Sequence, residues 1–367
     1  MNKIILTGAT GFVGSALAAT LLSRGATVLA VSRNDQDGCR TETAVREAAA
    51  GCGLDLGAAI RDRLVTFDAG QGPLADALDA DSLQAADAVW HCAAEMSYSA
   101  NKLAHAYQTN VCGTVDLYRK VAAHAPACKR FYYVSTAYTA GIRGGNTDET
   151  LHVGNPCVNS YQVTKWCAEQ SLSVLHQEGA LPVAIFRPTI VVGHAQTGWA
   201  RRNGFGFYMF VDAIEAVRRA GASHARLNLP GDVKPDLVTV DRVVDDMAGL
   251  TSREDQGAAF EVFHCSGGRE LNNRQLLSII SETTGVRATH GPPMTLLDQR
   301  IDRAIDANRL FASTDWTFNR TSLDAALKRE SRSTPVDKDL LARLVDWYRS
   351  EVPLKIPPVA GQLETQA

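Results

Sequence analysis

The sequence predicts an α/β fold, a doubly wound parallel sheet with a smaller, mixed, mostly helical C-terminal lobe. In the first half of the chain, short β-branched runs alternate with helical patterns, which is the arrangement expected of βαβ units. A turn with regularly spaced glycines follows the first of these runs directly, within residues 7–14. Beyond residue 188 the alternation loosens and helical patterns dominate. Together these observations predict a sheet-based unit followed by a second lobe.

The predicted strands leave room for a helix between most neighbours. The first strand covers residues 3–7, and the helix after it runs from about residue 12 to Arg24, where Gly25 suits a helix C-terminus. Long helices are expected over 102–123 and 160–176. The remaining strands of the first half are predicted at 27–32, 64–67, 88–92, 131–135 and 183–187.

The other segments are less regular. The long link between the second and third strands contains a helical stretch near 41–50. After the sixth strand we predict a helix near 208–219, a strand at 236–240 and an amphipathic helix at 340–348. The tail, residues 353–367, is polar and contains prolines, so we expect it to be disordered.

The composition excludes several classes of protein. Hydrophobic residues make up 45% of the 367 residues, which is enough for a packed core. Lys and Arg total 37 against 40 Asp and Glu, a net charge of −3, so nucleic-acid binding is not expected. No apolar run reaches the roughly 18 residues of a membrane span. The eight scattered cysteines form no C-x-x-C pair, so we expect a cytoplasmic protein without disulfides and without a metal site.

The segment TGATGFVG (7–14) predicts a dinucleotide site. Gly8 permits a tight turn, Gly11 lets the backbone approach a pyrophosphate, and Gly14 allows close packing of helix on strand. The N-terminus of the following helix offers free N–H groups to an anion. Because these glycines interrupt the apolar N-terminus, we do not interpret that stretch as a signal peptide.

The end of the second predicted strand distinguishes NADP from NAD. Arg33 offers a planar guanidinium to a 2′-phosphate and Ser32 can add a hydroxyl, which favours NADP(H). Asp35 lies two residues further on, so NAD stays open as an alternative. Asp68, at the end of the third strand, is expected to accept a hydrogen bond from the adenine amino group or to cap a turn.

Tyr161 and Lys165 lie four residues apart on a predicted helix, so both side chains share one face. An ammonium beside a phenol is expected to lower the pKa of the tyrosine from about 10. Tyr161 would then be a proton donor to a carbonyl oxygen that receives hydride. Thr136 follows the fifth strand and can present its hydroxyl to the same oxygen, with Ser135 as the alternative.

Several motifs in order resemble those of the extended short-chain dehydrogenase/reductases, over most of the chain to about residue 350. The resemblance implies a Rossmann fold, a pyridine nucleotide, Thr136, Tyr161 and Lys165 as catalytic residues, and Asn110 as the active-site asparagine. The matching segments are TGATGFVG (7–14), HCAA (91–94), NVCGT (110–114), VSTAY (134–138), YQVTK (161–165) and FRPTIVVG (186–193). The expected cofactor-binding residues are Gly8, Thr10, Gly11, Phe12, Val13, Gly14, Ser32, Arg33, Asp68, Ala93, Tyr161, Lys165, Pro188, Thr189 and Ile190.

We therefore divide the chain by expected role. Residues 1–188 are expected to form the NADP-binding domain, to which residues 236–250 return. Residues 189–235 and 251–352 are expected to form the substrate-binding lobe.

A narrower resemblance is to thioester reductase domains and fatty acyl-CoA reductases. It is based on PDLVTVDRVVDDM (235–247), FEVFHCSGG (260–268) and WTFNRTSLDAAL (316–327), although His194 stands where an acidic residue is common. The resemblance implies reduction of an acyl thioester, bound to CoA or to a carrier protein, to an aldehyde and on to the alcohol if a second reduction follows. No adenylation domain, carrier domain or membrane tail is apparent, so we expect a free-standing reductase. The expected substrate contacts are Ser135, Tyr138, Arg201 and Arg202.

Three alternatives stay open. The chain can be a ketone or aldehyde reductase of the dihydroflavonol or hydroxysteroid type. It can also be a nucleotide-sugar epimerase or dehydratase, although such enzymes typically retain NAD and have an acidic residue where this chain has Arg33. A non-catalytic NADP sensor is the third alternative, but proteins of that kind tend to lose the tyrosine or the lysine.

Overall fold

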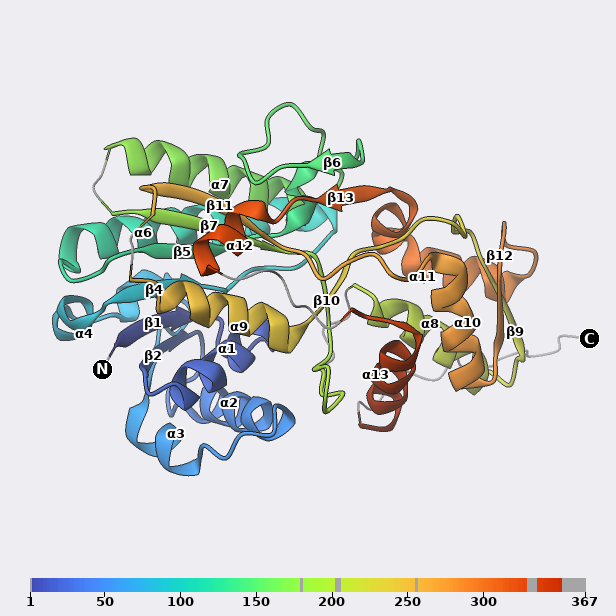
Figure 1. The fold of residues 1–367 in the computed structure, drawn as a ribbon, viewed down its shortest axis with the longest axis horizontal. Coiled ribbons are helices and arrows are strands. Elements are labelled where there is room, and N and C mark those ends of the chain that lie inside the picture. Colours follow the sequence, from blue (N-terminus) through green and yellow to red (C-terminus); the bar gives the residue numbers. More distant parts are fainter. Residues whose placement is uncertain (1, 179–180, 202–205, 255–256, 329–334, 352–367) are drawn as a thin grey trace, which may run out of the picture.

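Seven parallel strands form the central sheet, in the order β11-β7-β5-β4-β1-β2-β3 (Figure 1). The structure is a computed structural model and describes residues 2–178, 181–201, 206–254, 257–328 and 335–351. The strands of this sheet are β1 Lys3–Thr7, β2 Thr27–Ser32, β3 Leu64–Asp68, β4 Ala88–His91, β5 Phe131–Val134, β7 Val183–Pro188 and β11 Phe260–Cys265. The expected doubly wound α/β fold is confirmed, and the strands predicted for the first half match within one residue at each end.

Helices cover both faces of the sheet. The helices of the described residues, in the sheet domain and in the lobe together, are α1 Phe12–Ser23, α2 Cys39–Gly51, α3 Gly57–Arg63, α4 Ala80–Ala85, α5 Leu103–Tyr107, α6 Gly113–His124, α7 Ser160–Glu178, α8 Tyr208–Arg219, α9 Val240–Thr251, α10 Asn273–Thr284, α11 Leu296–Ser313, α12 Thr321–Leu327 and α13 Lys338–Glu351. Single 3-10 turns lie at Leu74–Ala77, Ala100–Lys102 and Ala137–Ala140, and a π-helical turn at Gln108–Cys112.

Successive strand residues point to opposite faces, which sorts the core into two clusters. On one face Ile4 and Leu6 pack with α1, α2 and α9. On the other face Ile5 packs with side chains of α4, α6 and α7, such as Leu83 and Leu172. Both faces are therefore covered, as expected for a parallel sheet whose strands are apolar on both sides.

The structure departs from the predicted division of the chain at β11. Residues 251–352 were expected to belong wholly to the substrate lobe, but Phe260–Cys265 is the edge strand of the main sheet, paired with β7. The reason is that this strand has apolar residues on both faces, with Val262 in one core cluster and Phe263 in the other. Helix α12 also contacts β11 and α9, so the late chain returns to the sheet.

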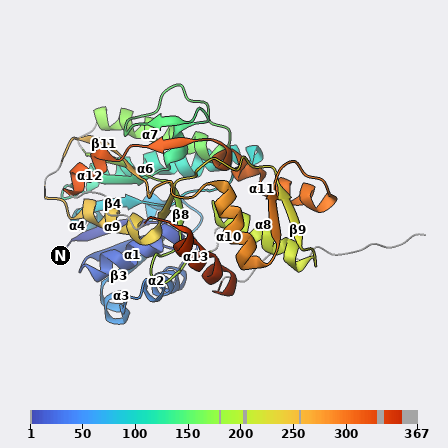
Figure 2. The same ribbon diagram turned by 45° about the vertical axis from the view of Figure 1, so that its right-hand side comes forward.

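The C-terminal lobe consists of α8, α10, α11 and α13 with a two-stranded ribbon of β9 His224–Leu227 and β12 Arg287–His290 (Figures 1 and 2). Helix α10 begins with a capping box of Asn272 and Gln275 and ends at Gly285, whose φ is 74°. Two further ribbons, β8 Ile190–Val192 with β10 Leu237–Thr239 and β6 Gly145–Thr147 with β13 Trp316–Phe318, are also parallel. The chain thus leaves the sheet for the lobe and returns more than once.

The long helix predicted at 102–123 is interrupted. Its residues form α5, the π-helical turn and α6 in succession, and Asn110 lies in the π-helical turn. Across the described residues, no helix is both long and apolar enough to cross a membrane, and no group of His, Cys, Asp or Glu is arranged to hold a metal ion. The expected disordered tail, 353–367, lies outside the described residues.

Candidate active site

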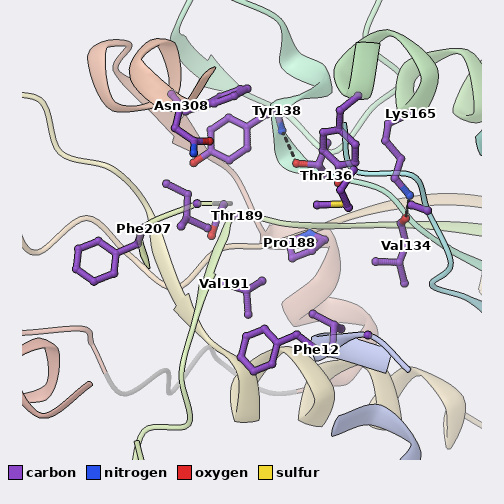
Figure 3. A pocket seen from close by; sticks show the side chains of 18 of the residues that line it. Phe12, Val134, Thr136, Tyr138, Lys165, Pro188, Thr189, Val191, Phe207 and Asn308 are labelled. Carbon is purple, nitrogen blue, oxygen red and sulfur yellow. Dashed lines mark hydrogen bonds between the residues drawn. The ribbon is translucent and has the colours of Figure 1, made fainter. Parts of the chain in front are cut away.

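A cavity of about 480 Å³ lies where the carboxyl ends of β1, β2, β5 and β7 meet the C-terminal lobe. Figure 3 shows side chains from both parts facing it. Most of the residues that the sequence singled out line this cavity. They are Gly8, Thr10, Gly11, Phe12, Val13, Gly14, Ser32, Arg33, Ala93, Ser135, Thr136, Tyr138, Tyr161, Lys165, Pro188, Thr189 and Ile190.

The glycine turn is packed too tightly for side chains. Gly8 has a φ of 78°, and a Cβ there would lie 2.7 Å from the amide nitrogen of Ala93. A Cβ on Gly14 would lie 2.1 Å from the carbonyl oxygen of Gly8. Helix α1 begins after Gly11 with no side chain capping it, so its first N–H groups remain available to an anion. These features fit the pyrophosphate of a dinucleotide.

The end of the cavity beside β2 contains two guanidinium groups. Arg33 is exposed there as predicted, and Arg40 of α2, which sequence reasoning missed, joins it. The Nη1 of Arg40 donates hydrogen bonds to the backbone oxygens of Arg33 and Asn34, at 2.9 and 3.1 Å. The buried Ser32 hydroxyl is hydrogen-bonded to Thr41 at 2.8 Å. The two arginines can therefore meet one phosphate from neighbouring positions.

Asp35 does not face the cavity. Its carboxylate accepts hydrogen bonds from the backbone N–H groups of Arg40 and Thr41, at 2.9 and 3.0 Å, and from the Thr41 hydroxyl at 2.6 Å. Both oxygens are thus used to hold the start of α2. This leaves Asp35 poorly placed to accept from a ribose hydroxyl, which is the contact that would favour NAD.

Asp68 also lies outside the cavity lining, contrary to the expected adenine contact. Its Oδ1 accepts from the backbone N–H groups of Asp35 and Gly70, at 3.0 and 2.9 Å. These hydrogen bonds hold the pKa of Asp68 below its usual value. The side chain caps the turn after β3, which was the other possibility that the sequence left open.

Lys165 is 2% exposed and lies behind Tyr161 on α7. Its Nζ donates a hydrogen bond of 2.6 Å to the carbonyl oxygen of Val134, and lies 4.6 Å from the centre of the Tyr133 ring. Burial lowers the pKa of Lys165 to about 8. The strand end at Val134 therefore fixes the ammonium beside the cavity.

Tyr161 keeps its proton, which corrects one expectation. The sequence predicted a pKa lowered by Lys165, but burial raises the pKa of Tyr161, with the nearby Tyr98 and Glu169 adding to the rise. The ammonium is 6.0 Å from the centre of the Tyr161 ring, too far to outweigh the loss of water. A phenol that is protonated at neutral pH is the form that donates to a carbonyl oxygen.

Thr136, rather than Ser135, contacts the phenol. A hydrogen bond with the Thr136 side chain opposes the rise in the pKa of Tyr161. The Thr136 side chain also accepts from the backbone N–H of Tyr138, at 3.3 Å (Figure 3). The Ser135 hydroxyl lines the cavity but has no hydrogen-bond partner among the described residues. Thr136 and Tyr161 are thus the hydroxyl pair that can hold one oxygen atom.

Asn110 lies outside the cavity lining and acts on its framework. Its Oδ1 accepts from the backbone N–H of Glu95 at 2.7 Å, and its Nδ2 donates to the Glu95 carbonyl and to the Thr164 hydroxyl, both at 2.9 Å. Thr164 precedes Lys165 on α7. Asn110, in the π-helical turn, therefore joins the loop after β4 to the helix that presents Tyr161.

Among the described residues, the Arg201 guanidinium contacts the glycine turn and α2 rather than the lobe. Its Nη1 donates to the carbonyl oxygen of Thr10 at 2.9 Å, and its Nη2 lies 3.6 Å from a carboxylate oxygen of Glu47. Just before it, Trp199 packs on Phe12 with ring centres 5.3 Å apart. Arg202, its expected partner in phosphate binding, lies outside the described residues.

The lobe half of the cavity was not predicted, apart from Tyr138. Its side chains come mainly from α8, α10, α11 and their flanking loops, where no motif marks them and only helical amphipathicity gives a signal. None of its described lining residues is charged. They are Met96, Tyr98, Tyr138, Gly206, Phe207, Phe210, Leu229, Pro235, Leu237, Asn273, Leu276, Leu277, Ile280, Asn308, Phe311 and Ala312.

Comparisons with known proteins agree with this architecture. The sequence profile of the NAD-binding family described as Male sterility protein matches residues 6–247. Aldehyde reductase lnaA of Aspergillus flavus is 30% identical over 225 residues, which are 56% of this chain but only 20% of that protein. The dTDP-glucose 4,6-dehydratase of Streptomyces antibioticus is 28% identical over 359 residues, 95% of this chain and 92% of that protein.

Among solved structures, the terminal R domain from the myxalamid PKS-NRPS biosynthetic pathway has the same fold. Its TM-score is 0.76 at 22% identity, over 97% of this chain and 92% of that one.

Proposed function

The chain belongs to the NAD-binding family described as Male sterility protein, and from this premise we propose that it is an NADPH-dependent thioester reductase. Its homologues are NAD(P)-dependent reductases, dehydratases and epimerases, which is consistent with an oxidoreductase. The proposed substrate is an acyl thioester, bound to a carrier protein or to CoA, which the enzyme reduces to an aldehyde. The structural likeness to a terminal R domain supports this choice.

The observation on which the proposal rests is the uncharged lobe half of the cavity. Apolar side chains such as Leu276, Ile280 and Phe311 dominate its described lining, and it contains no arginine, lysine or histidine. A nucleotide sugar would bring a diphosphate whose charge needs cationic partners. An acyl chain needs only apolar surface, which this half supplies. The lining therefore favours an acyl group over a nucleotide sugar.

Arg33 and Arg40 support NADPH as the coenzyme. Two guanidinium groups on one side of the cavity suit a 2′-phosphate, and Asp35 is occupied by the start of α2. The glycine turn would hold the pyrophosphate, and Lys165 would donate a hydrogen bond to the nicotinamide ribose.

A reduced nicotinamide bound in this cavity would supply hydride to a carbonyl carbon. Thr136 and Tyr161 donate hydrogen bonds to the carbonyl oxygen, where negative charge develops. Tyr161 then transfers its proton to that oxygen, and the buried Lys165 ammonium stabilises the phenolate that remains. A thioester carbonyl is more electrophilic than an ester carbonyl, and a thiol of pKa about 8.5 leaves readily once the hemithioacetal has formed.

The decisive experiment follows NADPH oxidation with a panel of acyl thioesters, free aldehydes, ketones and dTDP- or UDP-sugars. We expect turnover with thioesters and the corresponding aldehyde or alcohol as product. Turnover with aldehydes or ketones alone would replace the proposal with small-molecule carbonyl reduction. Product analysis by mass spectrometry also decides whether reduction stops at the aldehyde.

The second candidate is nucleotide-sugar chemistry. It is favoured by the 28% identity to a dTDP-glucose 4,6-dehydratase over nearly the full length of both chains. Conversion of a dTDP- or UDP-sugar without net NADPH consumption would establish it. The uncharged lining of the lobe half counts against this outcome.

A further inference from the structure

Two asparagines line the lobe half of the cavity, and their hydrogen bonding differs. Asn273 donates from Nδ2 to the backbone oxygens of Pro230 and Ala312, at 2.8 and 2.5 Å. Asn308, on α11, is also buried, at 3% exposure, but its amide makes a single hydrogen bond within the described chain, from Nδ2 to the Met209 sulfur at 3.1 Å. A thioether is a weak acceptor, so the amide of Asn308 keeps most of its hydrogen-bonding capacity.

Tyr138 presents a second polar group to the same region. Figure 3 shows Tyr138 and Asn308 on the same side of the cavity. Phe311 lies one helical turn after Asn308, and its ring centre is 4.9 Å from that of Tyr138, so the three side chains are neighbours. Trp316 and Phe318 also pack edge-on against the Tyr138 ring, at 5.2 and 5.6 Å. The phenol is therefore held in place, and its hydroxyl donates to no other described residue.

An amide that lines a cavity and has only a weak protein partner can bind a polar group of a ligand there. Most of the surrounding lining residues, such as Leu276, Leu277 and Ile280, are apolar. The described lining of this half contains no charged side chain, so an ionised group would lose its hydration there without compensation. The group that fits beside Asn308 and Tyr138 is thus polar but uncharged.

We propose that Asn308 and Tyr138 form a hydrogen-bonding subsite for an uncharged polar group on the acyl chain of the substrate. This inference rests on the proposed thioester reduction and specifies which acyl groups the enzyme prefers. The preferred acyl group is largely apolar and carries a hydroxyl, amide or carbonyl, as in hydroxyacyl or peptidyl chains, and a plain fatty acyl chain is disfavoured. The thiol arm, which must lead out to the carrier or to CoA, is a poorer match for an amide buried this deeply.

The test uses N-acetylcysteamine thioesters of equal chain length, unsubstituted or with one hydroxyl or amide at successive positions. For the unmodified protein we expect kcat/KM to be about 10–100-fold higher for the best polar isomer than for the unsubstituted thioester. Asn308→Leu should remove this preference by lowering kcat/KM for the polar isomer. A preference for the unsubstituted chain, or an equal loss on both members of the pair, would overturn the proposal.

The controls separate the subsite from folding. Asn228→Leu changes an exposed asparagine of the same lobe and should keep the preference. Tyr138→Phe keeps the aromatic packing and removes only the hydroxyl, so it should reduce the preference in the same direction even if Asn308→Leu proves unstable. The melting temperature and NADPH affinity of each variant report whether it is folded.

A binding measurement distinguishes failure of the subsite from failure of thioester reduction. Calorimetric binding of the matched primary alcohols in the presence of NADP needs no turnover. If the protein binds the polar alcohol more tightly and Asn308→Leu removes this difference, the subsite is supported. If the thioesters are not turned over in the same protein, thioester reduction is refuted. Equal binding of both alcohols would refute the subsite whichever reaction the enzyme catalyses.

Discussion

The two halves of the cavity differ in charge and in the origin of their side chains. The sheet half contains Arg33, Arg40 and Lys165, held by strand ends and helix starts. The described lining of the lobe half is apolar or neutral and comes mainly from helices without recognisable motifs. Under the proposed function this difference corresponds to a division of roles, in which the sheet half would bind the coenzyme and transfer the proton and the lobe half would select the substrate.

The largest effect should follow from removing the proton donor. Tyr161→Phe is expected to lower kcat about 100- to 10,000-fold because Phe cannot donate to the carbonyl oxygen. NADPH affinity, measured by fluorescence, should change little because the ring and Lys165 remain. Retained turnover would show that another group donates the proton, and would contradict the proposed role of the sheet half.

The next effect concerns the guanidinium pair. Replacing both Arg33 and Arg40 with Ala should weaken NADPH binding about 10- to 100-fold, because charge-assisted hydrogen bonds to the 2′-phosphate are lost. NADH affinity should stay nearly constant. Arg46→Ala, which changes an exposed arginine of the same helix paired with Glu42, is the matched control. An equal loss for both coenzymes would show that the pair does not read the 2′-phosphate.

Proton loss from Lys165 should weaken coenzyme binding at alkaline pH. The ammonium is charged below its pKa of about 8 and neutral above it, so NADPH affinity should fall by up to tenfold per pH unit above that value. Unfolding would not explain this loss of affinity. The pKa of Lys165 is lower in the folded protein, about 8, than in the unfolded chain, 10.5, so the contribution of Lys165 to stability increases as the pH rises from 8 to 10.5.

Lys165→Met provides the control for this profile. It should bind NADPH weakly with little pH dependence over the same range. If the NADPH affinity of Lys165→Met still decreases at alkaline pH, a group other than Lys165 is responsible for the pH dependence.

The smallest effect distinguishes two roles for Arg201. Because its guanidinium donates to the Thr10 carbonyl, Arg201→Ala should weaken NADPH binding only a few-fold, the value of about one hydrogen bond. The KM for the thioester should not change. A raised KM with unchanged NADPH affinity would instead restore the sequence-based interpretation, in which Arg201 meets phosphates of the substrate.

Most residues that the sequence singled out in the sheet half lie together in one cavity, because the patterns that mark them are local. The glycine turn and the Tyr161–Lys165 pair each occupy one short segment, and helical spacing alone places the pair on one face. Arg40 was missed because it reaches the cavity only when Asp35 fixes the start of α2. The pKa of Tyr161 was predicted in the wrong direction because burial depends on the whole fold.

The lobe half could not be predicted in the same way. Asn308 and Phe311 share a face of α11, but nothing in the sequence shows that this face meets Tyr138 from a distant loop. The edge strand β11 was missed although FEVFHC is a largely apolar run, since a short run of this kind can be strand or helix. The segment forms a strand because it pairs with β7, and the local sequence pattern does not reveal such a long-range pairing.

The repeated passage of the chain between sheet and lobe has a consequence for engineering. Helix α9 and strand β11 return to the sheet after one excursion into the lobe, and helix α12 returns after a second, so the sheet and the lobe are formed by one interwoven polypeptide. A chimera that exchanged the lobe at a single junction would remove an edge strand and cut several crossings. New specificity is therefore better sought by point changes on α10 and α11 than by transplanting the lobe.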